Sequence, residues 1–154
     1  MKIILTYGTF DLFHIGHLKL LQRARSLGDK LIVGVSSDEF NQLKGKRSFL
    51  PYAHRSEIVE ALECVDMVIP EDNWEQKELD IEKHNVDVFC MGGDWEGKFD
   101  SFREQCEVVY FDRTPEIDST SLRSMARVFD KTAIDQLSDA HLIIEDLLDK
   151  IKGS

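Results

Sequence analysis

Cysteine, proline and long apolar runs are scarce in this chain, which has three cysteines and three prolines among its 154 residues. Cys64, Cys90 and Cys106 are odd in number, form no CxxC pair and lie in or beside apolar stretches. This arrangement argues against a disulfide framework, a zinc site and dithiol redox chemistry. We therefore expect three reduced thiols that pack with other core side chains.

No apolar run approaches the roughly 20 residues that a membrane-spanning helix needs. The first strand-like run begins already at Lys2, which leaves no room before it for a secretory signal peptide. These two absences predict a cytoplasmic protein that does not insert into a membrane.

Basic residues are the minority among the charged ones. Nineteen Lys and Arg stand against 29 Asp and Glu, so the formal net charge is -10 at pH 7. An excess of negative charge argues against nucleic acid and the surface of an anionic membrane as partners. An anionic small ligand would therefore have to bind where a few basic residues come together.

Apolar runs rich in β-branched and aromatic residues alternate with segments of helical periodicity over most of the chain. The runs predict strands over residues 2–7, 30–37, 66–70, 86–94 and 106–111. The periodic segments predict helices over residues 17–27, 53–65 and 73–85, the first of which ends at a cap at Gly28. Residues 38–52 lack a clean period and predict a mobile basic loop with room for a helical turn.

Strands that alternate with helices are typical of an α/β protein with a mainly parallel sheet. At 154 residues and 42% hydrophobic content, the chain suits one compact domain. We therefore predict a single Rossmann-like domain with a doubly wound, mainly parallel five-stranded sheet, followed by C-terminal helices. In such sheets, ligands bind at the carboxyl ends of the strands, here near Gly8, Ser36, Gly92 and Asp112.

Beyond Thr120 the pattern is helical to the end of the chain. It predicts helices over residues 120–137 and 138–152, with Ser138 as the cap between them. An apolar stripe with 3-4 spacing, broken by one histidine, comprises Ile134, Leu137, His141, Ile144, Leu148 and Ile151. The stripe suits a helix packed on the domain or a helix that pairs two copies, because six positions fall short of a sustained coiled-coil repeat.

The stretch YGTFDLFHIGH places His14 and His17 around Gly16, where the first predicted strand gives way to the first helix. Backbone N–H groups and the helix dipole favour an anion at such a point. A spacing of three puts both imidazoles on one side of the turn, and Gly16 lets a phosphate approach the backbone closely. One histidine at a helix start is commonly without function, but two around a glycine and after GTFD indicate a phosphate site.

Two carboxylates and two glycines follow other predicted strands. Asp11 and Asp94 can each bind a ribose hydroxyl, orient a histidine or ligate magnesium, and the sequence leaves the choice open. Gly92 and Gly93 let a base or ribose lie against the backbone.

Arg113 directly follows the last predicted strand and should face the edge of the sheet where its strands end. Thr114, Ser119 and Thr120 add hydroxyls and backbone donors near the next helix start, where a phosphate can bind. Plain N-capping explains these hydroxyls equally well.

Other cations lie in or after the basic loop. Lys44 and Lys46 in LKGKR can fold over phosphates, although a charged loop is ordinarily just solvated. Arg55 lies at a helix start, where the dipole disfavours a cation, so an anion contact is favoured over a structural role. For Trp74 and Trp95, packing is favoured over stacking on a base.

With these residues the sequence resembles the cytidylyltransferase branch of the HxGH nucleotidyltransferases. YGTFDLFHIGH is similar to the first signature of that superfamily, and RTPEIDSTSLR, residues 113–123, to the second. SSDEFN, HR at 54–55, the segment 65–100 and QCEVVYFDRT resemble the glycerol-3-phosphate cytidylyltransferases within the branch. The resemblance spans residues 1–125, a nucleotidyltransferase catalytic domain, and leaves residues 126–152 as a C-terminal helical extension.

The resemblance implies an enzyme that transfers the cytidylyl group of CTP to glycerol 3-phosphate with Mg²⁺, giving CDP-glycerol and pyrophosphate by direct in-line attack. The implied catalytic residues are His14, His17, Lys44 and Arg113. The implied nucleotide-binding residues are Gly8, Thr9, Phe10, His14, His17, Gly92, Asp94, Arg113, Thr114, Ser119 and Thr120. The implied acceptor-binding residues are Asp11, Lys44, Lys46, Arg55 and Trp74. The magnesium ligands remain unassigned, and a homodimer is implied as well.

Three alternatives stay open. Phosphocholine or phosphoethanolamine can be the acceptor, although a quaternary ammonium needs an aromatic cage that the sequence does not reveal. An adenylyltransferase on the same fold is the second alternative. The third is a nucleotide-binding sensor without catalysis, because Glu63 stands where the family more often has arginine and Pro115, Glu116 and Asp118 depart from the second signature.

Overall fold

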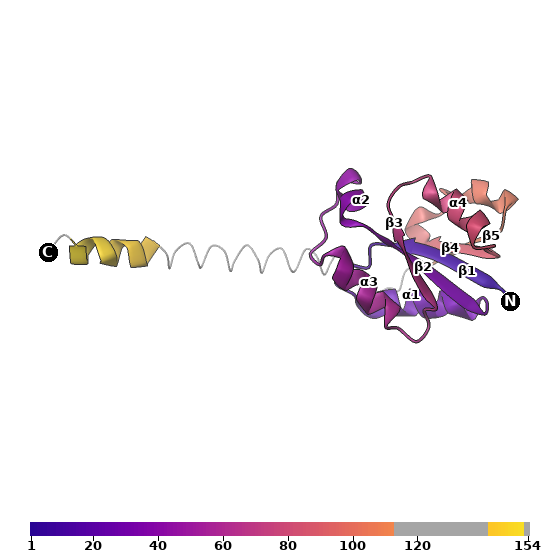
Figure 1. Cartoon of the computed structure of the whole chain (residues 1–154), viewed down its shortest axis with the longest axis horizontal. Coiled ribbons are helices and arrows are strands. Elements are labelled where there is room, and N and C mark those ends of the chain that lie inside the picture. Colours follow the sequence, from indigo (N-terminus) through magenta and orange to yellow (C-terminus); the bar gives the residue numbers. More distant parts are fainter. Residues whose placement is uncertain (113–141, 153–154) are drawn as a thin grey trace. The chain divides into compact units, whose positions relative to one another are not determined.

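The computed structural model describes residues 1–112 and 142–152. These residues belong to two units of the chain, residues 1–119 and 120–154. The first unit contains the sheet and its covering helices (Figure 1), and residues 142–152 of the second form a helix, as predicted. The predicted helix over 120–137, the start of the helix at 138–141 and the boundary at 125/126 lie outside the described residues.

The first unit is built on a five-stranded sheet in which every described strand pair is parallel. Its strands are β1 Ile3–Gly8, β2 Lys30–Ser36, β3 Met67–Glu71, β4 Val88–Gly92 and β5 Glu107–Phe111. Their spatial order is β3-β2-β1-β4-β5. This is the doubly wound Rossmann-like order, so the predicted fold class is confirmed.

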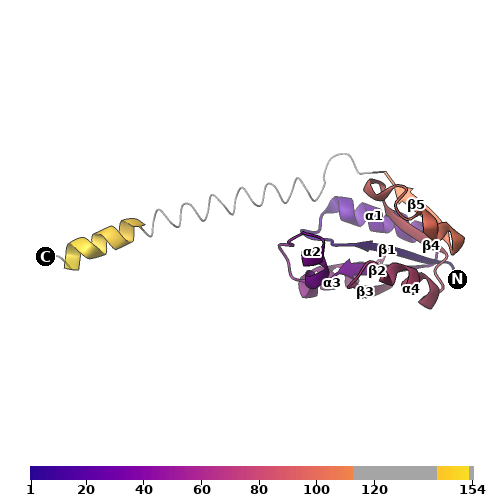
Figure 2. The same cartoon turned by 90° about the horizontal axis from the view of Figure 1, so that it is seen from above.

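Helices connect consecutive strands and cover both faces of the sheet (Figure 2). They are α1 Ile15–Ser26, α2 Asp38–Leu43, α3 Tyr52–Glu60 and α4 Gln76–Lys83, with the 3-10 turns η1 Gly93–Trp95 and η2 Asp100–Glu104. One core cluster joins α1 and α3 to side chains such as Ile4 and Val33. The other joins α4 and the η1–η2 region to side chains such as Leu5 and Phe89. Neighbouring residues of β1 therefore pack into opposite cores, as the alternation of a strand requires.

This topology predicts which edge of the sheet would bind a ligand. The chain runs from β1 outward to β3 and then returns to the other side of β1 for β4 and β5. Between β1 and β4 the winding changes direction, and ligands of such folds bind beside the carboxyl ends of the strands at that point. Gly8 and Gly92 are the last residues of these two strands.

The predicted basic loop is partly helical. Residues 38–43 form α2, whose N-terminus is capped by Ser37 accepting the N–H of Phe40 at 3.1 Å. Phe40 is only 1% exposed, so burial of this ring and the cap together stabilise a helix too short for its periodicity to be recognised. Residues 44–51 remain a loop.

Two other predicted helices are shorter than expected, and one cap is wrong. α3 spans residues 52–60 rather than 53–65, and α4 spans residues 76–83 rather than 73–85. Leu27 caps α1 in a right-handed conformation, so Gly28 is not the cap. Glycine is required at 28 because a Cβ there would lie 2.7 Å from the Lys2 carbonyl oxygen.

The three cysteines are unpaired, as expected. Cys90 is fully buried in the core, and burial raises the pKa of its thiol to about 12. Cys64 and Cys106 are half-buried, and partial burial raises their pKa as well. Within residues 1–112 and 142–152, no helix is both long and apolar enough to cross a membrane.

Candidate active site

Two imidazoles form the N-terminus of α1, directly beyond the carboxyl end of β1. His14 is the N-cap, and its Nδ1 accepts the backbone N–H of Gly16 at 2.9 Å. Nδ1 of His17 accepts the backbone N–H of His14 at 3.2 Å, which completes a capping box. The two rings stack with centroids 4.0 Å apart. We call residues 9–17 the imidazole turn.

These hydrogen bonds determine the protonation state of both rings. A nitrogen that accepts an N–H carries a lone pair rather than a proton, so both Nδ1 atoms are unprotonated here. In the neutral imidazole, the proton is then on Nε2. Each ring thus presents an Nε2–H donor, whose position is determined by the backbone of the turn. Such preorganised donors can stabilise negative charge that develops on a phosphate.

Backbone strain and aromatic packing hold the imidazole turn in shape. Phe10 and Leu12 have positive φ angles of 53° and 49°, a conformation that non-glycine residues rarely adopt. The Phe10 ring packs edge-on against His17 at 5.5 Å, and Phe13 lies 5.2 Å from the same imidazole. At Gly8 a Cβ would lie 2.8 Å from the Phe10 ring, so only glycine admits this packing.

Asp11 ties the imidazole turn to the loop that follows α2. Its carboxylate is fully buried and accepts the backbone N–H of Phe49 at 2.7 Å and of Leu50 at 3.0 Å. These contacts give Asp11 a structural role at the edge of the site. Its predicted contact with the acceptor remains a prediction.

Arg55 is fully buried and joins three segments. Its guanidinium donates to the carbonyl oxygens of Thr9 at 2.8 Å and Ser36 at 2.7 Å, and to Asp38 Oδ1 at 2.8 Å. Although partial burial acts in the opposite direction, the Tyr52 N–H and the Arg55 guanidinium lower the pKa of Asp38. Arg55 thus binds the ends of β1 and β2 together. The sequence argument favoured an anion contact over a structural role, and these contacts are structural; direct contact with substrate remains a prediction.

Lys44 caps the C-terminus of α2 and turns back toward the sheet. Its Nζ donates to Ser36 Oγ at 3.1 Å and lies 3.9 Å from Glu71 Oε1. Burial lowers the pKa of Lys44 to about 8, and the positive charges of Lys46, Lys77 and Arg55 act in the same direction. The Glu71 carboxylate opposes this shift.

Lys77 and Glu71 are site residues that the sequence argument missed. They form a buried ion pair, and Ser36 Oγ donates to the other carboxylate oxygen of Glu71 at 2.6 Å. Lys77 and Glu71 are each 2% exposed. We call Lys44, Glu71 and Lys77 the lysine cluster. In a charged segment such as NWEQKELDIEKHN, nothing distinguishes a buried lysine from a solvated one.

Aromatic rings surround the lysine cluster. Nζ of Lys77 lies 4.9 Å from the ring centroids of both Tyr7 and Trp74, and 5.8 Å from those of Phe40 and Phe99. We call these four rings the aromatic cage. Burial and the hydrogen bond to Asp80 raise the pKa of Tyr7, so its phenol stays protonated. Trp74 is 48% exposed and forms the solvent edge of the cage.

The other predicted site residues divide into two groups. Gly92 ends β4, Asp94 is exposed in η1, Thr9 contacts Asn41 at 3.1 Å, and Lys46 is exposed. All four therefore lie at or beyond the carboxyl ends of strands. Arg113, Thr114, Ser119 and Thr120 lie outside the described residues, as do the departures from the second signature.

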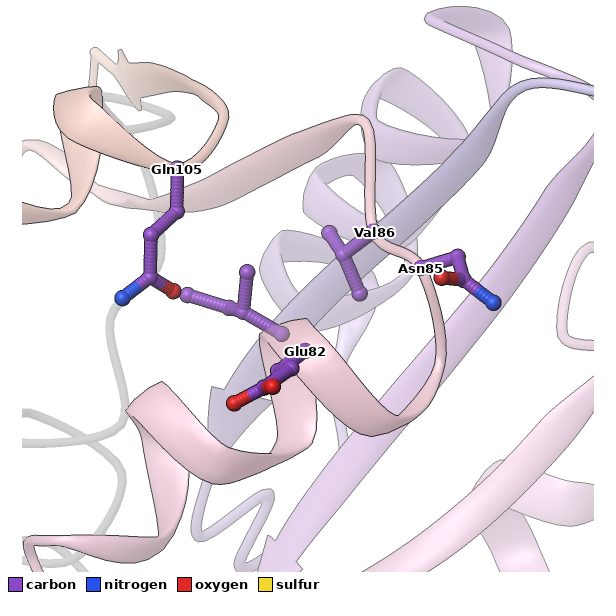
Figure 3. Close-up of a pocket in the computed structure, with 5 residues that line it drawn as sticks. Glu82, Asn85, Val86 and Gln105 are labelled. Atoms are coloured by element: carbon purple, nitrogen blue, oxygen red, sulfur yellow. The ribbon is translucent and has the colours of Figure 1, made fainter.

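A hollow of about 500 Å³ lies elsewhere on the molecule (Figure 3). It is lined by Ile81, Glu82, Asn85, Val86 and Gln105. These residues precede β4 and β5, so the hollow is at the amino ends of the strands, opposite the imidazole turn. Among the residues that the structure describes, no group of three or more His, Cys, Asp or Glu side chains could hold a metal ion.

Comparison with known proteins agrees with this geometry. Residues 5–146 match the cytidylyltransferase-like family. Glycerol-3-phosphate cytidylyltransferase of Bacillus subtilis (strain 168) is 58% identical over 123 residues, which is 80% of this chain and 95% of the relative. The enzyme of the same name from Staphylococcus aureus (strain NCTC 8325 / PS 47) is 54% identical over 123 residues, 80% of this chain and 93% of that relative.

A solved structure supports the fold. The lipopolysaccharide core biosynthesis protein from Thermoplasma volcanium GSS1 superposes with a TM-score of 0.65 at 22% identity, covering 73% of this chain and 98% of that one. The family match spans most of the chain and includes both imidazoles and the lysine cluster. The chain therefore belongs to the cytidylyltransferase-like family, and within it to the nucleotidyltransferases of the glycerol-3-phosphate cytidylyltransferase type.

Proposed function

We propose that this protein transfers the cytidylyl group of CTP to glycerol 3-phosphate and releases pyrophosphate. One observation carries the proposal: two neutral imidazoles are oriented by backbone N–H groups at the carboxyl end of β1, where doubly wound folds bind nucleotides. The names of the two relatives above supply the nucleotide and the acceptor.

The reaction needs no covalent intermediate with the protein. A phosphate oxygen of glycerol 3-phosphate attacks the α-phosphorus of CTP, and the bond from that phosphorus to the bridging oxygen of pyrophosphate breaks. Negative charge grows on the equatorial and bridging oxygens in the transition state. The Nε2–H groups of His14 and His17 donate to these oxygens, and their positions are set before the substrate arrives.

The acceptor binds at the lysine cluster in this proposal. The ammonium of Lys44 attracts its phosphate, with the exposed Lys46 on the same loop. The glycerol hydroxyls meet the Glu71–Lys77 pair and the Trp74 ring, which can donate, accept and pack against them. A chain of contacts from the Gly8 carbonyl through Ser36 to Lys44 links this cluster to the end of β1.

Magnesium enters as part of the nucleotide in our proposal. Mg²⁺ commonly keeps several waters and is held by substrate phosphates with one or two carboxylates. The described residues provide no cluster of three ligands, which suits an ion carried by the triphosphate better than one in a protein cage. Asp94, exposed just beyond β4, is the carboxylate that we propose for contact with the complex.

Pyrophosphate release tests the function directly. CTP, ATP, GTP and UTP would be crossed with glycerol 3-phosphate, phosphocholine and phosphoethanolamine in the presence of Mg²⁺. We expect release only with CTP and glycerol 3-phosphate. Release with CTP and another acceptor would show that this compound, rather than glycerol 3-phosphate, is the substrate. Release with ATP would indicate an adenylyltransferase. No release with any pair would favour the nucleotide-binding sensor.

We also propose that the protein acts as a homodimer. The helix over residues 142–152 exposes large apolar side chains, among them Leu142, Ile144 and Ile151 at 62%, 55% and 69%. Burying these side chains against a second copy would remove them from water. Light scattering at micromolar concentration should give twice the mass of one chain, and a monomeric mass would refute the proposal.

The cellular setting follows from the product. We propose that the enzyme works in the cytoplasm, where CTP is made, and that CDP-glycerol is the donor for a cell-wall or capsule polymer such as teichoic acid. Fractionation should recover the activity with the cytosol. Depletion of the protein should lower the cellular CDP-glycerol concentration, and an unchanged concentration would contradict this role.

A further inference from the structure

The ammonium of Lys77 is buried between aromatic rings and a carboxylate. It lies within 6 Å of four ring centroids, those of Tyr7, Trp74, Phe40 and Phe99. Its side chain is 3% exposed, and its charge is paired with the equally buried Glu71 carboxylate. Several aromatic faces together with a carboxylate are the groups by which proteins recognise a quaternary ammonium ion. The chain therefore fills its own cation site.

We propose that Lys77 is a specificity-determining residue, because its ammonium occupies the place that the head group of a quaternary ammonium acceptor would take. The site is thereby left to an acceptor with a small neutral head, such as the glycerol of glycerol 3-phosphate. This inference rests on the proposed function, because it takes the aromatic cage to be the acceptor end of the site.

Three of the four rings of the aromatic cage are held in place by groups other than Lys77. Tyr7 donates its hydroxyl to Asp80 and packs so tightly over Gly34 that a Cβ there would lie 2.1 Å from the ring. Phe40 is 1% exposed and Phe99 is 8% exposed, so both rings are held by the core.

The Glu71 carboxylate also has contacts other than Lys77. Ser36 Oγ donates to Glu71 Oε1 at 2.6 Å, and Lys44 Nζ lies 3.9 Å from the same oxygen. Removal of the Lys77 side chain would therefore leave a carboxylate and four aromatic faces around an open volume. The aromatic faces are complementary to a trimethylammonium group in surface, and the Glu71 carboxylate, which it would share with Lys44, supplies the opposite charge.

The first test measures binding without any chemistry. Full-length Lys77→Ala would be titrated calorimetrically with choline and with tetramethylammonium, and separately with 3,3-dimethyl-1-butanol, the uncharged isostere of choline. We expect choline to bind Lys77→Ala at least 10-fold more tightly than it binds the unchanged protein. The uncharged isostere should bind at least 10-fold more weakly than choline, because it lacks the charge that the cage and Glu71 attract.

Matched variants separate the cage from nonspecific effects. Lys98→Ala removes an exposed lysine whose Nζ lies 5.2 Å from one ring, that of Trp95, and should leave choline binding unchanged. Lys77→Met removes the charge but keeps the volume filled, so it should not bind choline. Lys77→Ser also opens the cage, and it serves as the second open variant if Lys77→Ala does not fold.

The second test is kinetic. The ratio of kcat/KM for phosphocholine to kcat/KM for glycerol 3-phosphate should rise at least 100-fold in an open variant. A folded open variant that binds choline no better than the unchanged protein would overturn the proposal, and so would equal binding by Lys77→Met. The unchanged protein with CTP and glycerol 3-phosphate tests the proposed function separately, so its inactivity would leave the choline-binding result interpretable.

Discussion

The imidazole turn and the lysine cluster differ in how their polar groups are held in place. The turn uses neutral donors, each held by a backbone N–H within three residues of it. The lysine cluster contains full charges that are buried among aromatic rings. Its two ammonium groups and the Ser36 hydroxyl all contact the Glu71 carboxylate. Neutral donors can be preorganised by local backbone alone, whereas buried charges need counter-ions from other elements. The difference shows that neighbouring groups at one edge of a sheet can depend on contacts of different range: the turn on residues close in sequence, and the lysine cluster on residues from separate elements.

The largest expected effect lies in the imidazole turn. Replacing His14 or His17 by alanine should lower kcat by about 10³-fold, with the dissociation constant of CTP changed by less than about 10-fold, because the Nε2–H donors act most strongly on transition-state charge. Steady-state kinetics and CTP titration measure the two quantities. The exposed His54→Ala is the control. Equal losses in rate and affinity would contradict a role in the transition state.

Arg55 joins the two regions, since it contacts Thr9 of the turn and Ser36 beside the cluster. Arg55→Met should lower the free energy of unfolding by about 3 kcal/mol, because several buried acceptors lose their donor. Urea unfolding measures this loss, and the exposed Arg47→Met should change it little. If Arg55→Met keeps its stability but loses affinity for the acceptor, the predicted anion contact is correct and the structural role is secondary.

The lysine cluster should be the pH-sensitive region. Burial lowers the pKa of Lys44 to about 8, so deprotonation above that pH removes a positive charge from the acceptor site. The acceptor phosphate, with a second pKa of about 6, is already fully ionised there. We therefore expect kcat/KM for glycerol 3-phosphate to fall about 10-fold per pH unit above this pKa.

Lys44→Arg separates this titration from others, since arginine stays charged throughout the range. Its profile should remain flat above pH 8 even if its activity is lower overall. A profile that falls with the same midpoint in both proteins would assign the titration to another group.

The smallest expected effect concerns Trp74, which is half exposed at the rim of the aromatic cage. Trp74→Phe keeps an aromatic face and should raise KM for glycerol 3-phosphate by about 2-fold, whereas Trp74→Ala should raise it by about 10-fold, consistent with loss of one packing contact. Acceptor-dependent kinetics at saturating CTP measure both values. A larger effect on KM for CTP would assign Trp74 to the nucleotide instead.

Several features of the site could be predicted because their signals are local. The strand, the glycine and the two histidines at a spacing of three fall within one short stretch, and local capping at the helix start brings the imidazoles together. The mainly parallel five-stranded sheet was also predicted, from the alternation of strands and helices. The contacts that bury Arg55 could not be predicted, because a cation at a helix start gives no sign of the three carbonyls and the carboxylate that surround it.

The sequence by itself therefore determined the fold class and the imidazole turn, since both depend on periodicity and on contacts between near neighbours. Only the tertiary structure decided that Lys77 and Glu71 are buried together and that Tyr7, Phe40, Trp74 and Phe99 enclose them. Those residues come from β1, α2, the end of β3 and the loop after it, α4 and the segment after η1. Burial and charge pairing are properties of the packed chain, because each depends on which distant residues the sheet brings to the same edge.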